Sequence, residues 1–211
     1  TVTNEWKNYR WKSLMPAKES QTLVNSVGEF PIGIKKFVLK ADPTELKKEL
    51  QAQINKIKSL GIKPTHIDSH EGALFFNKEH FRVYLEVGEE NKLPVFVPRG
   101  VDAHFGKGFP KPKNIVVIKD LYMARKGLKK TKWKEFYLNT IRGLKPGISQ
   151  LIVHLSYDDN EMREISIDHP DYGAKWRHLD YEAVTNISFK KALKQNDIKL
   201  VTWKEIQKVL Y

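Results

Sequence analysis

The 211-residue sequence contains no cysteine. This absence excludes disulfides and thiolate chemistry, so any metal site must use histidine and carboxylate ligands. Long apolar runs are missing too, since none approaches the ~20 residues that a membrane-spanning helix needs. There is neither an internal repeat nor a glycine-rich phosphate fingerprint, because the glycines at 106–108 lack a preceding strand and a following helix.

The first residue is not methionine, and Thr1, Val2 and Thr3 read as the end of a strand. We therefore expect a processed chain or a fragment of a longer one. No signal peptide is visible, but the natural start is unseen. The compartment stays open between the cytoplasm and an exported location.

Positive charge is abundant, with 37 Lys and Arg against 25 Asp and Glu and a net charge of +12. Such an excess is typical of proteins that bind nucleic acid, anionic surfaces or anionic polymers. Many basic residues fall within 107–134, however, and the others are spread over predicted helix faces. This distribution favours a solvated basic surface and argues against a nucleic-acid partner. The shares of hydrophobic residues (40%) and charged residues (29%) are ordinary for a globular protein.

Apolar residues spaced three and four apart predict helices at 43–60, 78–90, 132–144, 176–195 (one helix or a pair) and 203–211. Short apolar runs predict strands at 62–68, 93–97, 149–154 and 198–201. Alternation of this kind indicates βαβ units and a parallel sheet. We therefore predict an α/β fold in a single domain, 1–211.

Two segments break this alternation. Residues 1–42 are predicted to be irregular, with Trp6, Tyr9 and Trp11 lining the core or a groove rather than exposed. Residues 100–131 are rich in Gly, Pro and Lys, and only 115–118 and 121–124 look ordered. A long loop inside a compact domain is usually functional or disordered, so we expect a lid or an irregular insertion there.

Residues capable of chemistry follow the first predicted strand, where the active sites of parallel α/β folds form. His66, Asp68 and His70 would share one face of an extended strand, but the two histidines would then lie about 13 Å apart and could not bind one ion. If the strand ends near Asp68, His70 at the mouth is the better metal ligand, and His66 or Asp68 orients it. We take His70 and then His66 as candidate metal ligands, and Asp68 as a candidate substrate contact.

Later strand ends add two candidates. A catalytic metal needs about three protein ligands, and His154 could be one of them or the general acid that protonates a leaving group. Arg99 could grip an anion, orient a carboxylate or pair at the surface. A lone histidine at a strand end is more often a hydrogen-bonded structural residue, and that interpretation stays open for His154. His80 and His178 lie on predicted helices and are expected to be surface or packing residues.

The stretch Pro64-Thr65-His66-Ile67-Asp68-Ser69-His70 resembles the YdjC-like carbohydrate deacetylases, the group that includes chitooligosaccharide and hopanoid-biosynthesis deacetylases. Three other parts of the chain are similar to segments of that family: 3–11, 146–154, and 176–180 together with 198–206. There are departures, because Leu155 stands where the family usually has proline and Gln150 where it usually has glutamate. The segment 100–131 is the least similar part.

The resemblance implies a distorted (β/α) barrel of the polysaccharide-deacetylase-like type and a divalent metal, Mg²⁺ or Zn²⁺, held by one aspartate and two histidines. The family's Asp-Asp and Gly-x-His-Leu-Thr motifs are not in this sequence. We expect both to lie upstream of Thr1, so that this chain lacks the first strands of the barrel. Of the implied ligands, His70 is the one that this chain carries. His154 matches the family's late histidine.

The function implied by the resemblance is removal of acetyl groups from N-acetylated amino sugars or oligosaccharides. The metal would polarise the amide carbonyl and activate a bound water as nucleophile. His154 would protonate the departing amine, and Trp6, Arg99 and Asp68 would contact the substrate. The alternative is a catalytically incomplete glycan- or nucleic-acid-binding protein that keeps the fold. A barrel without its first strands exposes strand edges, so we also expect poor solubility unless a partner segment or a homodimer covers them.

Overall fold

The computed structural model describes residues 1–100 and 115–211. The α-helices are α1 (Ile34–Lys40), α2 (Pro43–Ser59), α3 (Lys78–Glu90), α5 (Trp133–Gly143), α6 (Asn160–Ile165), α7 (Ala174–Thr185), α8 (Ile187–Gln195) and α9 (Trp203–Leu210). Short 3₁₀ helices are η1 (Ala17–Glu19), η2 (His70–Phe75) and η3 (Lys130–Lys132). The strands are β1 (Phe96–Pro98), β2 (Val116–Ile118), β3 (Asp120–Tyr122) and β4 (Ser149–Leu151). The fold is therefore α/β, as predicted.

The chain divides into two compact units, one made of 1–117 with 201–211 and the other of 118–200. Within the described parts of both, no helix has the length and apolar content to cross a bilayer. Residues 101–114, which are part of the lid predicted at 100–131, lie outside the described residues. The later part of the predicted lid, 115–131, contributes β2, β3 and the start of η3.

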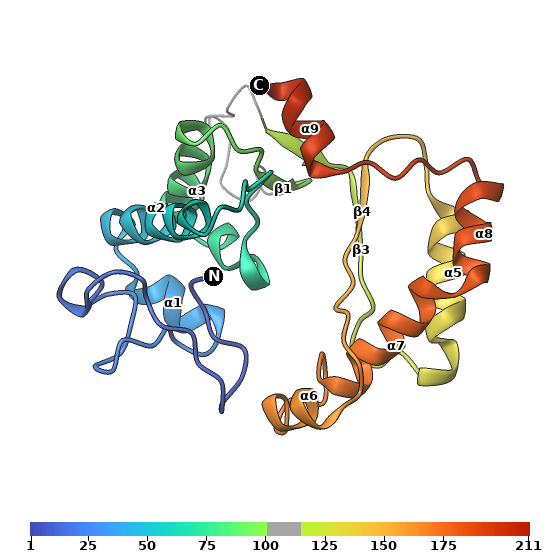
Figure 1. Ribbon diagram of the computed structural model, residues 1–211, viewed down its shortest axis with the longest axis horizontal. Helices are drawn as coiled ribbons and strands as arrows, with labels where there is room; N and C mark the ends of the chain where they lie inside the picture. The colour runs from blue at the N-terminus through green and yellow to red at the C-terminus, as the bar shows by residue number, and fades with distance from the viewer. Residues whose placement is uncertain (101–114) are drawn as a thin grey trace. The chain divides into compact units, whose positions relative to one another are not determined.

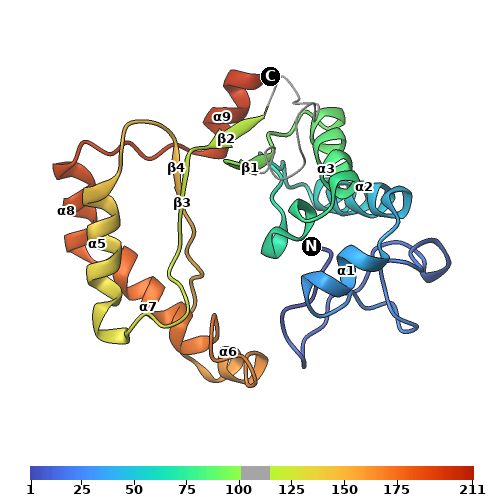
Figure 2. The same cartoon turned by 180° about the vertical axis from the view of Figure 1, so that it is seen from behind.

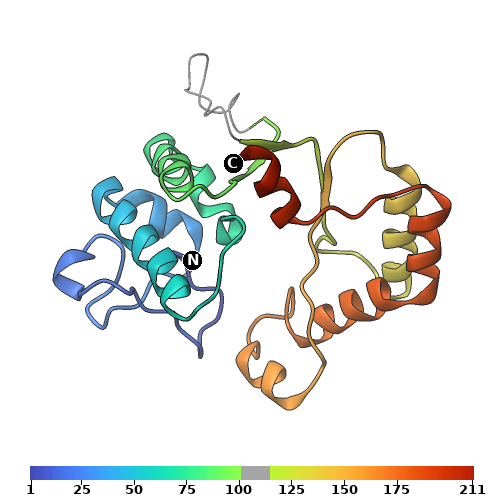
Figure 3. The same cartoon turned by 45° about the horizontal axis from the view of Figure 1, so that its top comes forward.

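In the first unit, α2 and α3 pack side by side (Figures 1 and 3). Helix α2 begins where the Asp42 carboxylate accepts from the backbone N–H groups of Thr44 and Glu45, and Pro43 occupies the first turn. It ends before Gly61, whose φ of +76° suits a glycine. At the start of α3, the Asn77 side chain accepts from two backbone N–H groups in the same way.

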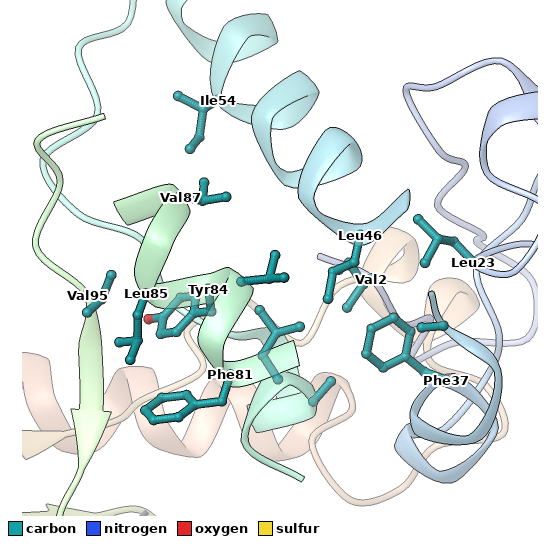
Figure 4. Close-up of a cluster of buried hydrophobic side chains, with 14 of the residues drawn as sticks. Val2, Leu23, Phe37, Leu46, Ile54, Phe81, Tyr84, Leu85, Val87 and Val95 are labelled. Carbon is teal, nitrogen blue, oxygen red and sulfur yellow. The ribbon is translucent and has the colours of Figure 1, made fainter. Parts of the chain in front are cut away.

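The core of this unit lies between α1, α2, α3 and β1 (Figure 4). The buried apolar side chains drawn and labelled there are Val2, Leu23, Phe37, Leu46, Ile54, Phe81, Tyr84, Leu85, Val87 and Val95. Their helical members follow the three- and four-residue spacing that the sequence shows.

Two contacts fix the segment that precedes η2. Ile67 forms a parallel bridge with Val95, and the Tyr84 hydroxyl donates to the carbonyls of Ile67 (2.8 Å) and Phe96 (3.0 Å). Gly88 permits the close approach of α3 to Val95, because a Cβ at Gly88 would lie 2.3 Å from a Val95 methyl. The residues from Asp68 onward are thereby held beside the start of β1.

In the second unit, β3 and β4 run parallel, with Asp120 opposite Ser149 and Tyr122 opposite Leu151. Helix α5 packs against α7 and α8, as Figure 2 shows. Trp133, Tyr137 and Trp176 are buried in their shared core. Aromatic and alanine side chains make up most of that core.

The predicted helices at 43–60, 78–90, 132–144 and 203–211 are confirmed to within a residue at either end, and 176–195 is a helix pair. The strand predictions were less accurate. Residues 62–68 form a single bridge, β1 begins later than predicted, β4 stops at Leu151, and 198–201 is irregular. Leu200 and Val201 are 73% and 54% exposed, so apolar composition alone was misleading there. Helices α1 and α6 were not predicted from the sequence.

Candidate functional site

His70 opens η2 at a sharp change of chain direction in the first unit. Glu71 and Gly72 follow it with φ of 54° and 68°, inside the left-handed region. Such a conformation is strained for glutamate and is found often at functional sites. The turn is closed by the buried Ser69, whose hydroxyl accepts from the Leu74 N–H at 3.0 Å.

The His70 ring has polar neighbours on both edges. Its Nδ1 lies 3.0 Å from the hydroxyls of both Thr1 and Thr3. Carboxylate oxygens of Glu5 and Glu71 lie 3.9 Å from Nε2 and 4.0 Å from Nδ1. A hydroxyl can accept as well as donate, so Nδ1 can carry the proton and leave the Nε2 lone pair available to a cation or an acid.

Asp68 lies next to this ring. Its carboxylate accepts from the Ser69 N–H at 2.6 Å. Although the residue is exposed as a whole, crowding around the carboxylate raises its pKa, while the Ser69 N–H and His70 act in the opposite direction. A carboxyl with a raised pKa holds a proton more readily than one in bulk water.

His66 stacks on Trp203, with ring centroids 4.6 Å apart and an interplanar angle of 6°. Burial lowers the pKa of His66, so the neutral ring is favoured. His66, Asp68 and His70 all line one cavity of about 190 Å³, together with Thr1 and apolar side chains of α2 and α3. The sequence predicts that these three residues belong to one site, and in the structure they line the same cavity.

The other candidates of the first unit are more dispersed. Trp6 is half-buried, which agrees with a place in the core or a groove, but Tyr9 and Trp11 are 48% and 40% exposed. The prediction that these two are buried was wrong, because they pack edge-to-face on each other at the surface. Arg99 follows β1 and is exposed.

Neither described part of the chain gathers three His, Asp or Glu side chains into a group that could hold a metal ion. A catalytic metal takes about three protein ligands. His70 and its carboxylate neighbours therefore make up part of a donor set, and the described residues do not form a complete one.

His154 belongs to the second unit and is half-buried where the chain leaves β4. Its backbone N–H donates to the Asp180 carboxylate at 3.0 Å, and its ring meets that of Tyr172 edge-on at 5.2 Å. Tyr172 has a φ of 61°, a strained value for a tyrosine. Its carbonyl accepts from the Arg177 side chain at 2.6 Å, which holds it in place.

Asp180 and Tyr172 were not among the candidate residues predicted from the sequence. A signal for Asp180 was present, because it lies four residues after Trp176 and three before Ala183, on the buried side of α7. An acidic residue at such a position is rare enough to mark a specific role. Tyr172 lies in an irregular segment, where no periodicity could identify it.

Three comparisons relate this chain to known proteins. The model of the YdjC-like protein family matches residues 1–195. A carbohydrate deacetylase of Thermus thermophilus is 28% identical in an alignment that covers the whole of this chain and 76% of the relative. A carbohydrate deacetylase of Thermoanaerobacter pseudethanolicus is 27% identical in an alignment that covers 91% of this chain and 72% of the relative. A crystal structure from Enterococcus faecalis V583, assigned as a candidate cellobiose-phosphate cleavage protein, has a TM-score of 0.74 and 21% identity over 98% of this chain and 75% of its own. That last similarity shows the fold alone. Because the family model matches nearly the whole length, the chain belongs to the YdjC-like protein family.

Proposed function

We propose that this chain acts as a carbohydrate deacetylase, a hydrolase that removes acetyl groups from N-acetylated amino sugars or oligosaccharides. The observation that carries the proposal is the family match together with two relatives of that name that align with nine-tenths or more of the chain. The cavity lined by His66, Asp68 and His70 supports it, because it brings proton-transferring groups together in a sheltered place. The proposal includes the distorted (β/α) barrel, of which the described strands would form part.

The proposal extends to a divalent cation, Mg²⁺ or Zn²⁺, with His70 as one ligand and His66 as a second candidate. Support comes from the His70 ring, where the two threonine hydroxyls at Nδ1 leave Nε2 available. When bound, such a cation would polarise the amide carbonyl and acidify a water molecule. Asp68, with its raised pKa, is suited to hold a proton or a substrate hydroxyl beside it.

His154 is proposed as the acid that protonates the departing amine. Two restraints support this role, since the backbone of His154 is held by Asp180 and its ring packs against Tyr172. Positioned acids of this kind typically contribute 10²–10⁴-fold to a rate. Trp6 and Arg99 are proposed as substrate contacts, an aromatic face for a sugar ring and a donor for its polar groups.

Acetate release from N-acetylglucosamine oligomers by the natural full-length protein tests the proposal. We expect His70→Ala to lose both bound metal, measured by elemental analysis, and acetate release, measured enzymatically. His178→Ala is the matched control, because this half-buried histidine of α7 is paired with Glu182 and is not among the residues that line the cavity. Normal metal content in His70→Ala would reject the ligand assignment. Absence of acetate release from every N-acetylated sugar offered would reject the deacetylase.

A binding protein that keeps the fold is the second candidate. The observation that favours it is the lack, within the described residues, of three grouped metal-ligating side chains. The net charge of +12 makes a salt series with DNA, RNA and anionic glycans the appropriate measurement. Counterion release requires affinity for nucleic acid to fall steeply with salt, so weak and flat binding would exclude that ligand.

A further inference from the structure

Asp180 is the most deeply buried acidic residue of the second unit, with 1% of its surface exposed. Its Oδ1 accepts from Trp133 Nε1 at 2.7 Å and from the Tyr137 hydroxyl at 2.5 Å. Its Oδ2 accepts from the His154 backbone N–H at 3.0 Å. All three donors are neutral, so hydrogen bonds alone compensate the loss of water around this carboxylate.

Burying a carboxylate is costly even when it is hydrogen-bonded, and an apolar side chain of similar size would fill the same space. The contacts of the two carboxylate oxygens indicate what Asp180 provides that an apolar side chain would not. One oxygen is fixed by two side chains of α5, and the other holds the backbone of the segment that follows β4. Asp180 thereby joins the packed helices α5 and α7 to His154 in the segment that follows β4.

We propose that Asp180 is a positioning residue, which sets the place of His154 by accepting its backbone N–H while α5 holds the carboxylate still. The importance of this role for catalysis rests on the proposed function of His154. The placement of His154 by Asp180 does not rest on that function, because it is a property of the fold. The Tyr172 ring restrains the imidazole from its edge, so backbone and side chain are held by different residues.

Asp180→Asn discriminates between positioning and simple packing. Asparagine has the same shape, but one of its two arms is an NH₂ donor. If the NH₂ group points toward His154, it faces the backbone N–H, and two donors meet. If it points toward α5, it faces the donors of Trp133 and Tyr137, and donors again meet donors. Trp133→Phe is the matched control, because it removes one donor from Oδ1 and leaves the contact between Oδ2 and His154 intact.

Amide hydrogen exchange gives a readout independent of activity. We expect exchange at the His154 amide to be protected in the wild type and in Trp133→Phe, and to become about tenfold faster in Asp180→Asn, as loss of one hydrogen bond predicts. The Ile141 amide of α5 should change little. A His154 amide that exchanges freely in the wild type would overturn the proposal without any variant. Unchanged protection in Asp180→Asn would also overturn it.

A double-mutant cycle on acetate release then tests the consequence for the reaction. We expect Asp180→Asn to lower kcat about tenfold with little change in KM, and to have no further effect in a His154→Ala background, because the two residues act through one contact. Additive losses would overturn positioning through His154. Full activity of His154→Ala alone would instead reject the role of His154 and leave the exchange result standing.

Discussion

Three carboxylate or imidazole side chains are fully buried in the described structure, and each has a hydrogen-bond partner. Glu49 is 0% exposed and accepts from the Ser13 hydroxyl at 2.5 Å and from the backbone N–H of Leu14 and Met15. The His80 Nε2 lies 2.8 Å from the Ala41 carbonyl. Asp180 is the third. Each joins a helix to a segment distant in sequence, so polar contacts as well as apolar burial specify how these segments pack.

Glu49→Ala should remove the acceptor for several buried donors at once. Leaving buried donors without a partner costs more than a hydrogen bond contributes, so we expect the free energy of unfolding to fall by about 2–4 kcal/mol. Urea denaturation measures the effect. Glu79→Ala removes an exposed carboxylate of α3 that pairs with Arg82 and should change stability by less than about 0.5 kcal/mol. Equal losses in the two variants would show that burial of Glu49 has no special role.

His80 should make the protein acid-sensitive. Burial lowers its pKa in the folded chain, although the Ala41 carbonyl acts the other way. Protonation therefore favours the unfolded chain, whose histidine has a pKa of about 6.5. Stability from this group is complete above that pH and falls as the pH drops below it, by up to about 1.4 kcal/mol per pH unit. Denaturation across pH 4–8 should show a shallower dependence of the unfolding free energy on pH for His80→Gln than for the wild type. A slope unaffected by His80→Gln would contradict this assignment.

The candidate site was predictable from sequence where the relevant residues are close in the chain. His66, Asp68 and His70 lie within five positions, so one local turn brings them around one cavity. Asp180 and Tyr172 could not be located in this way. Their contacts with His154 span 26 and 18 positions, and only tertiary packing creates them.

At the scale of elements, helices were predictable because their signals are local. The cap at Asp42 and the apolar spacing of α2 are both contained in one stretch of sequence. Strand pairing depends on residues far apart, and four predicted strands became two short strands, one bridge and one irregular segment. Gly88 illustrates a constraint that depends on tertiary packing, since its lack of a side chain matters only because Val95 lies against it.

Gly88→Ala should push α3 away from the segment that carries Val95. A new Cβ would lie 2.3 Å from a Val95 methyl and 3.1 Å from the Leu93 carbonyl oxygen. Overpacking of this kind typically costs about 1–3 kcal/mol. Gly143→Ala in α5 is the matched control, because no atom lies within 4 Å of the new Cβ, and helix propensity should make it neutral or slightly stabilising. Calorimetric melting measures both, and equal melting temperatures for the two variants would argue against a tight contact at Gly88.

At the scale of the whole molecule, each of the two compact units has its own hydrophobic core. The first is built from residues between Val2 and Val97, and the second from residues between Ala124 and Ala192. The sequence predicts a single domain, 1–211, and this stays a prediction, because length and composition do not show how buried residues are divided among cores.

Separate cores predict separate responses to core mutations. Leu46 and Tyr137 are both fully buried, and their truncation to alanine should cost about 2–5 kcal/mol each. We expect Leu46→Ala to lower amide protection in 1–100 and leave 118–200 unchanged, and Tyr137→Ala to do the reverse, as measured by hydrogen exchange with mass spectrometry. Loss of protection throughout the chain in either variant would instead favour the single cooperative domain.

The contact between Trp133 and Trp176, edge-to-face with ring centroids 4.8 Å apart, gives the second unit an optical signature. Two indoles this close are expected to couple their strong far-ultraviolet transitions, which would produce a paired positive and negative band in far-ultraviolet circular dichroism. Both partners belong to the α5–α7 core, so this band reports the integrity of that core alone. Substituting either indole by phenylalanine abolishes the band and thereby assigns it. Unfolding of the second unit can then be followed by spectroscopy in the unlabelled protein.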